Sequence, residues 1–267
     1  MVAGLSVDPR VTEMRTEPNT HRLYHDLAYL WPIISPPAEY AAEAEYWRAA
    51  LRDKLGPGRH HILELGVGGG HNLSHLTNDF DATAVDLSPR MLALSEELNP
   101  GVEHRLGDMR TVRLGATFDA VLIHDAIGHM LTEEDLSAAF ETAACHLRPG
   151  GALLVAPDWV KESLRESDPP TVFHWVRKLG DLEVTVQEFL CDPDPDDTQI
   201  ESTYTYIIKE KGGERVEQDT HVTGLFPMAT WTRLLGQPGF QVETVGLPEN
   251  RGGYGNLLFV GVLRAGT

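Results

Sequence analysis

A glycine-rich turn is the stretch of this sequence best suited to binding a small ligand. It reads ELGVGGG from Glu64 to Gly70 and overlaps the end of an apolar segment, Ile62–Leu65. Glycine permits positive φ and lets a ligand approach the backbone closely. In an open α/β sheet, a turn at the carboxyl end of a strand is where nucleotide-like ligands bind. We therefore expect Glu64, Gly66, Gly68 and Gly70 to shape a ligand pocket.

The spacing of the glycines and the position of the next acidic residue indicate which class of ligand the turn could bind. A dinucleotide-binding turn has the pattern G-x-G-x-x-G, and counting from Gly66 places His71 at its third glycine. Asp86 ends a second apolar segment, Ala82–Val85, where a carboxylate can accept hydrogen bonds from ribose hydroxyls. NAD-dependent oxidoreductases share such an acid, so Asp86 alone leaves them open as an alternative.

A further polar loop follows the apolar segment Phe118–Ile123, which predicts a central parallel strand. The loop reads HDAIGH from His124 to His129. A parallel sheet points such a loop at the ligand crevice. His129 could accept a proton there, because an unperturbed histidine has a pKa near 6.5. The alternatives are that His129 only orients a ligand, or that it caps the next helix or bonds to a covering segment.

The flanking segments predict the elements that would position these residues. Residues 1–20 are polar and aperiodic and predict a mobile arm. Leu23, Leu27 and Leu30 form one helical face up to Pro32, and residues 38–55 are strongly helix-forming. We expect residues 21–58 to form lid helices that carry the aromatic residues Tyr24 and Tyr40.

The chain changes character after the predicted core, residues 59–158. Leu182–Leu190, Gln199–Lys209 and Glu214–Leu225 alternate apolar with polar or β-branched residues and are separated by turns. They predict an antiparallel three-stranded insertion within residues 159–227, which would cover the site or form a dimer surface. Residues 228–267 should then return to the core with a last helix and two strands.

Composition excludes several classes of function. The 267 residues carry 22 Lys and Arg against 40 Asp and Glu, a net charge of −18 that disfavours nucleic acids and anionic membranes. Two cysteines, Cys145 and Cys191, do not suggest a disulfide framework, and we expect a cytoplasmic protein. His71 and His75 are spaced like metal ligands, but the sequence places no third ligand, so no metal is expected.

Four segments, in order, carry a family resemblance. They are ELGVGGG, the acid followed by LSPRML at 87–92, GDM at 107–109 and LRPGG at 147–151. Together they resemble the class I S-adenosylmethionine (SAM) methyltransferases over roughly residues 60–160. Tyr24, the helix AEYAAEAEYW, GDMR, IGH and the final RGGYGNLLFVG resemble, more narrowly, actinomycete amino-sugar N,N-dimethyltransferases.

The resemblance implies an α/β fold with a Rossmann-like, seven-stranded, mostly parallel sheet and helices on both faces. The helical lid and the insertion after the fifth strand would be added to it. It also implies methyl transfer from SAM, with S-adenosylhomocysteine as product, to a nitrogen or oxygen of a small molecule; amino-sugar N-methylation is favoured. The alternatives are a non-catalytic SAM-binding dimeric protein and an NAD-dependent oxidoreductase. In either SAM-binding case a homodimer is possible.

The same resemblance assigns roles to individual residues. His129 would be catalytic. The cofactor would contact Tyr24, Glu64, Gly66, Gly68, Gly70, Asp86, Leu87, Met91, Asp108, Met109 and His124. The acceptor would contact Tyr40, Asp125, Asp158, Trp159 and Arg251.

Overall fold

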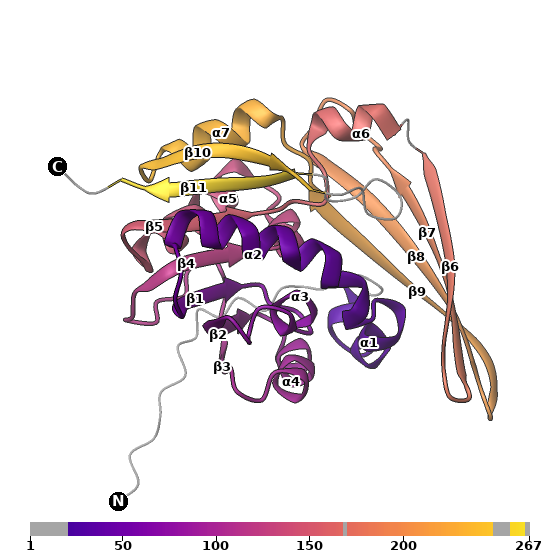
Figure 1. Ribbon diagram of the computed structural model, residues 1–267. Helices are drawn as coiled ribbons and strands as arrows, with labels where there is room; N and C mark the ends of the chain where they lie inside the picture. The colour runs from indigo at the N-terminus through magenta and orange to yellow at the C-terminus, as the bar shows by residue number, and fades with distance from the viewer. Residues whose placement is uncertain (1–20, 168–169, 248–256, 265–267) are drawn as a thin grey trace, which may run out of the picture.

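The computed structural model describes residues 21–167, 170–247 and 257–264, which form two sheets (Figure 1). The larger sheet has seven strands in the order β10-β11-β5-β4-β1-β2-β3. Their bounds are β1 His60–Leu65, β2 Phe80–Asp86, β3 Glu103–Leu106, β4 Phe118–Ile123, β5 Leu147–Val155, β10 Phe240–Gly246 and β11 Leu257–Leu263. β11 runs antiparallel to both of its neighbours, β10 and β5, and the other strand pairs of this sheet are parallel. The predicted Rossmann-like sheet is therefore confirmed.

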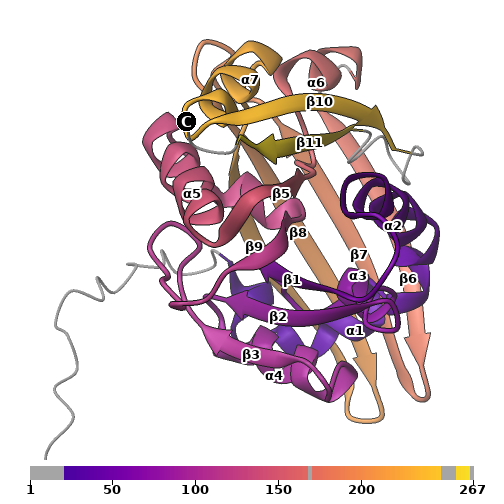
Figure 2. The same ribbon diagram turned by 60° about the vertical axis from the view of Figure 1, so that its left-hand side comes forward.

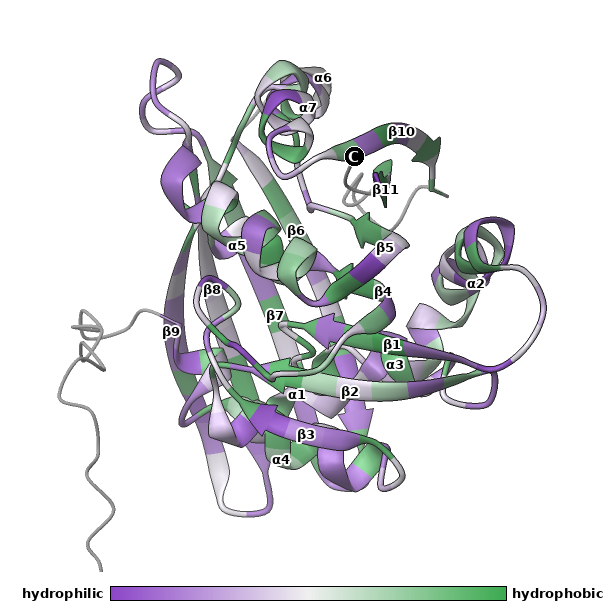
Figure 3. Ribbon diagram, turned by 90° about the vertical axis from the view of Figure 1, so that its left-hand side faces the viewer, coloured by the Kyte–Doolittle hydropathy of each residue, from purple (hydrophilic) through white to green (hydrophobic). Residues whose placement is uncertain are grey.

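Helices cover both faces of this sheet, as predicted. On one face α2 (Ala41–Leu55), α3 (His71–Ser74) and α4 (Pro89–Leu98) bury an apolar cluster. On the other face α5 (Glu133–Cys145) and α7 (Met228–Gly236) bury a second cluster. Figure 3 shows that β4 and β5 are mostly hydrophobic whereas the edge strand β3 is mostly hydrophilic, because only the central strands are covered on both faces.

Side-chain caps fix where two of these helices begin. The Ser88 hydroxyl accepts a hydrogen bond from the Met91 amide at the start of α4, and Thr132 does the same for Asp135 at the start of α5. Each cap satisfies one of the backbone N–H groups that the first turn of a helix leaves unpaired. Both helices therefore start directly after the loops that leave β2 and β4.

The N-terminal segment departs from the predicted single helix. It forms three short pieces, η1 (Arg22–Tyr24), η2 (Ala28–Leu30) and α1 (Trp31–Ile34), followed by η3 (Pro37–Tyr40) before α2. Pro32 lies in the first turn of α1, where proline is tolerated, and does not end a helix. The three leucines of the predicted face are nevertheless buried, against strands of the second sheet.

The second sheet has four antiparallel strands, so the predicted number of three is wrong. They are β6 (Thr171–Leu179), β7 (Leu182–Cys191), β8 (Gln199–Glu210) and β9 (Gly213–Gly224), preceded by α6 (Lys161–Ser167). Figure 2 shows these long strands running behind the core strands. In β6, apolar residues point to both faces, with Phe173 and Trp175 on one and Val172 and Val176 on the other. Apolar and polar residues therefore do not alternate along β6, and this alternation is the pattern that predicts a strand.

No helix in the described part of the chain is both long and apolar enough to cross a membrane. The predicted arm, residues 1–20, and Arg251 lie outside the described residues. The division of the chain into five segments stays a prediction.

Candidate active site

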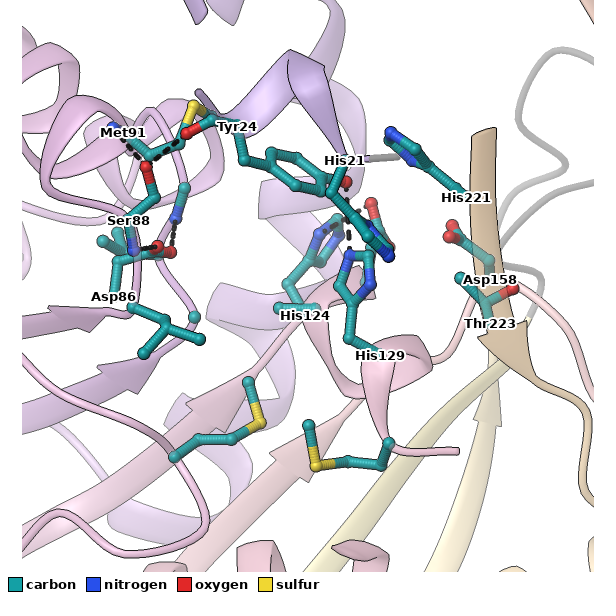
Figure 4. A pocket seen from close by; sticks show the side chains of 18 of the residues that line it. His21, Tyr24, Asp86, Ser88, Met91, His124, His129, Asp158, His221 and Thr223 are labelled. Atoms are coloured by element: carbon teal, nitrogen blue, oxygen red, sulfur yellow. Dashed lines mark hydrogen bonds and ion pairs between the residues drawn. The ribbon is translucent and has the colours of Figure 1, made fainter. Parts of the chain in front are cut away.

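A cavity of about 410 Å³ opens at the carboxyl ends of β1, β2 and β4. The N-terminal segment and the inner faces of β8 and β9 close its other side (Figure 4). It is lined by all the described residues for which a role was predicted except Gly70. The parallel sheet thus brings residues far apart in sequence to one crevice.

Gly66, the first glycine of the turn, leaves space that any other residue would fill. Gly66 has φ +76°, and a Cβ there would overlap Ala126 and lie 2.8 Å from the Met109 Cε atom. Gly70 has φ +74° and lies behind the cavity, where its carbonyl accepts a hydrogen bond from Asn99 Nδ2 at 3.0 Å. Gly70 therefore sets the course of the turn and does not line the cavity.

Asp86 ties the glycine turn to the start of α4. One carboxylate oxygen accepts from the Gly68 amide at 2.7 Å, and the other accepts from the Ser88 amide at 2.8 Å. Burial raises the pKa of Asp86, although these amide hydrogen bonds oppose the rise. Leu87 and Met91 line the cavity beside it. This is the end of the cavity at which a ribose would meet a carboxylate.

Asp108 and Met109 line the neighbouring part of the cavity, together with Arg110, whose role the sequence analysis did not consider. The Arg110 guanidinium contacts both Asp108 oxygens, with the shortest distance 2.6 Å, and also donates to Asp135 at 2.8 Å. Burial would raise the pKa of Asp108, but the Arg110 hydrogen bonds and charge lower it. Asp108 is thus a fixed, ionised hydrogen-bond acceptor.

Around the glycine turn, several buried polar atoms that line the cavity have no hydrogen-bond partner among the described residues. They are Glu64 Oε2, His71 Nδ1, Trp31 Nε1 and both side-chain polar atoms of Asn72. Unpaired buried polar groups are costly, so their gathering beside the glycine turn fits a ligand with an amino group and a carboxylate. The amino-acid part of SAM has both groups, and these residues would hold it.

His71 and His75, which have the spacing of metal ligands, lie in different surroundings. His71 packs on Trp31 in the cavity, whereas His75 Nε2 contacts the Pro37 carbonyl at 2.8 Å. Within the described ranges, no group of three or more His, Cys, Asp or Glu residues is arranged to hold a metal ion.

Charged groups gather where the cavity meets the second sheet. His124 contacts Glu43 at 2.6 Å and Asp125 at 3.1 Å. Burial would lower the pKa of His124, but the two carboxylates outweigh it and raise the pKa, which favours the imidazolium. Burial and the nearby Asp125 raise the pKa of Asp158, which favours its neutral form. The buried Glu43 is a site residue that sequence reasoning missed.

His129 is buried among aromatic rings. Its Nε2 lies 3.3 Å from the Tyr24 hydroxyl. Burial, and then repulsion by His221 and His21, lower the pKa of His129 to about 3. Burial raises the pKa of Tyr24, so its hydroxyl keeps the proton and can donate it to His129. This geometry favours the orienting role over that of an obligatory base.

Comparison with known proteins agrees with this site. Residues 62–151 match the family model of a methyltransferase domain. The chain is 33% identical, over 91% of its length and 97% of the relative's, to the dTDP-3-amino-3,4,6-trideoxy-α-D-glucopyranose N,N-dimethyltransferase of Streptomyces venezuelae. It is 31% identical, over 76% of its length and 79% of the relative's, to the dTDP-3-amino-3,6-dideoxy-α-D-glucopyranose N,N-dimethyltransferase of Streptomyces fradiae.

A solved structure agrees over nearly the whole chain. The sugar N-methyltransferase KedS8 from Streptoalloteichus sp ATCC 53650 is 26% identical, with a TM-score of 0.77 and 99% of each chain covered. The relatives are methyltransferases and leave no support for an NAD-dependent oxidoreductase. The chain has a glycine turn, an acid at the end of β2, another after β3, and a cavity at the carboxyl ends of these strands. Together with its relatives, this shows that it belongs to the SAM-dependent methyltransferases, in the family of amino-sugar N,N-dimethyltransferases.

Proposed function

We propose that the enzyme methylates the amino nitrogen of a nucleotide-linked amino sugar. The two relatives that share about a third of its sequence act, by their names, on dTDP-linked 3-amino sugars. The observation in this chain that carries the proposal is a second cavity, of about 630 Å³, beside the first. It lies on the inner face of the second sheet and offers room for an acceptor larger than a bare amine.

The wall shared by the two cavities suits an amine. Asp125 and Asp158 line both cavities, and Glu188 lines the second. Carboxyl groups accept hydrogen bonds from an amine and attract an ammonium in a buried setting. Aromatic residues supply apolar surface for the rest of the acceptor, as ring faces do in most small-molecule sites. They include Tyr40, Phe173, Trp175 and Tyr206.

We assign each part of SAM to a group of residues that lines the first cavity. Glu64 and Asn72 would hold the amino-acid part of SAM, Asp86 the ribose, and Asp108 with Met109 the adenine. Bound SAM supplies a methyl group attached to a sulfonium sulfur, and the neutral thioether that departs is a good leaving group. The chain then needs to exclude water and to hold the amine in line with the methyl carbon, effects worth up to roughly 7–11 kcal/mol.

The dTDP-linked 3-amino sugars of the two relatives test this function. With each sugar as acceptor, we expect the enzyme to convert SAM to S-adenosylhomocysteine. The sugar should gain one or two methyl groups on its nitrogen, and mass spectrometry would measure both products. The matched control is the same nucleotide sugar with a hydroxyl in place of the amine, which should not react. Equal methylation of that control would contradict the proposal. SAM binding without turnover on any sugar would favour the non-catalytic alternative.

We further propose that two copies pair through the outer face of the second sheet. Four apolar side chains on this face are exposed, Val172, Val176, Phe189 and Val216, with fractions of 42–65%. Val176 and Val216 lie at opposite ends of a row across the sheet that also holds Thr185 and Ile207. A contiguous exposed apolar face on a sheet marks an association surface.

Introducing charge on this face should separate the copies. The double variant Val176→Lys, Val216→Lys is expected to sediment as a monomer at concentrations where the wild type is a dimer, because two buried ammonium groups would oppose pairing. Leu106→Lys, at a leucine on β3 that is 63% exposed, should leave the dimer intact. A monomeric wild type would contradict the proposal.

A cytoplasmic location is also proposed, consistent with two free cysteine thiols.

A further inference from the structure

His221, on β9 of the second sheet, reaches the active site from an element that the cofactor motifs do not include. Asp219 and His221 are two residues apart in the strand, so both side chains point to the inner face of the sheet. His221 Nε2 lies 2.9 Å from Asp219 Oδ2. His221 lines both cavities, where the reacting ends of cofactor and acceptor would meet.

Asp219 is held rigidly for this contact. Its side chain is fully buried, and its two oxygens accept backbone hydrogen bonds from Arg22 at 2.8 Å and Leu23 at 2.7 Å. Burial would raise the pKa of Asp219, but the hydrogen bond and charge of His221 and the two backbone amides lower it. The carboxylate is therefore ionised, and it fixes the orientation and the Nε2–H tautomer of His221.

This tautomer leaves Nδ1 of His221 as the nitrogen with a free lone pair. Among the described residues, the hydrogen bonds of the His221 side chain involve only Nε2. The centroid of the imidazole ring lies 5.1 Å from the ring centroids of His21 and Tyr24, and 5.0 Å from that of Tyr204. Figure 4 shows His21, Tyr24, His129 and His221 gathered around one space from three different elements.

The other histidines of this space are less suited to accept a proton. His129 already faces the Tyr24 hydroxyl, and its pKa is lowered to about 3 by burial and by its histidine neighbours. The pKa of His21 is lowered to about 4, by burial and by repulsion from His221. His124 already carries a proton between two carboxylates. His221 is the one of the four with a buried carboxylate on one nitrogen and a free lone pair on the other.

We propose that His221, oriented by Asp219, accepts the proton that the acceptor amine loses for methyl transfer. The inference rests on the proposed amine acceptor. An ammonium N–H proton passes to Nδ1, and the freed lone pair forms the new bond to the methyl carbon. The bond from that carbon to sulfur breaks, and its electron pair stays on the sulfur. The imidazolium then returns its proton to solvent, so each round of methylation can use the same histidine.

Several titratable groups from different elements face His221. They are His21 and Tyr24 of the N-terminal segment, His129 of η4 (Asp125–His129), Tyr204 of β8, Asp219 of β9, and Asp125 and Asp158 across the cavities. A general base acts only in its unprotonated form. The wild-type kcat/KM should therefore fall on the acidic side.

His221→Asn tests the proposal, with the dTDP-linked 3-amino sugar of the Streptomyces venezuelae relative as acceptor. At neutral pH we expect kcat/KM to fall by about 10²-fold, the lower end of general-base effects. Raising the pH should restore most of the loss, because the free amine then arrives already deprotonated. A purely structural role would give no such rescue. His129→Asn should retain an acidic limb, because the Asp219–His221 pair is intact in that variant.

A second measurement does not depend on turnover. Nitrogen-15 NMR of histidine-labelled protein should find neutral His221 protonated at Nε2, and Asp219→Asn should weaken that preference. Neutral His221 protonated at Nδ1, or an unchanged acidic limb in His221→Asn, would overturn the proposal. If wild-type protein methylates no amino sugar, the proposed function fails. The NMR result then still decides whether the Asp219–His221 pair is arranged to accept a proton.

Discussion

Asp86→Ala should remove most of the thermal stabilisation that SAM gives the wild-type protein. A ligand that binds only the folded state contributes about 2.7 kcal/mol at 100 times its Kd. For a chain of this size that corresponds to a rise in Tm of about 5–10 °C. One Asp86 oxygen accepts from the Gly68 amide and the other from the Ser88 amide, so the substitution should release the glycine turn. It would also remove the proposed acceptor for the ribose hydroxyls.

The control lies on the same strand. Asp81 is near the opposite end of β2, half-exposed and paired with Arg59, so Asp81→Ala should leave the SAM-induced shift in Tm unchanged. NAD should stabilise neither protein. A full SAM-induced shift in Asp86→Ala, measured by differential scanning fluorimetry over a range of SAM concentrations, would show that the glycine turn and ribose site do not depend on this carboxylate.

The core could be predicted from the sequence because its signals are local. The glycine turn, the acid at the end of β2 and the capped start of α4 occupy one stretch, Glu64–Leu98, and each rests on neighbours a few residues away. The β6 strand gave no such signal, since apolar residues occupy both of its faces. The N-terminal pieces were predicted as one helix because their leucines have helical spacing, although they are buried against the second sheet.

The parts of the site that escaped prediction depend on contacts between distant segments. Glu43 stands among surface-like residues of a helix-forming stretch, yet it meets His124, 81 positions later, at 2.6 Å. Asp219 meets the Leu23 amide across 196 positions. His129 was correctly placed at the carboxyl end of β4. Its low pKa follows from burial and then from repulsion by His221 and His21, which the second sheet and the N-terminal segment bring to it.

Glu64→Gln should make the ligand-free protein more stable at pH 8 and weaken SAM binding at the same time. Burial raises the pKa of Glu64 from an ordinary value of 4.5 to about 8. Between these two pH values the folded state holds a proton that the unfolded state has released. Stability therefore falls as pH rises through this window, by an upper limit of about 5 kcal/mol, and it levels off above pH 8.

Glutamine has the same shape and cannot ionise, so the variant avoids this loss. The difference in Tm between Glu64→Gln and the wild type should be small near pH 5 and grow steadily towards pH 8. Glu103→Gln, at an exposed glutamate of β3, should follow the wild type throughout. Parallel curves for Glu64→Gln and the wild type would mean that Glu64 ionises normally in the fold.

SAM binding should respond in the opposite direction, because SAM carries positive charge into the cavity. The ionised Glu64 would form a charge-assisted hydrogen bond with the ligand's ammonium, and glutamine would retain only a neutral one. We expect at least a tenfold loss of affinity, about 1.4 kcal/mol, by isothermal titration calorimetry at pH 8. Wild-type binding at pH 7 should also release a proton, seen as a dependence of the heat on the buffer. Glu64 would thus lower the stability of the empty fold above pH 4.5 and strengthen the binding of the cofactor.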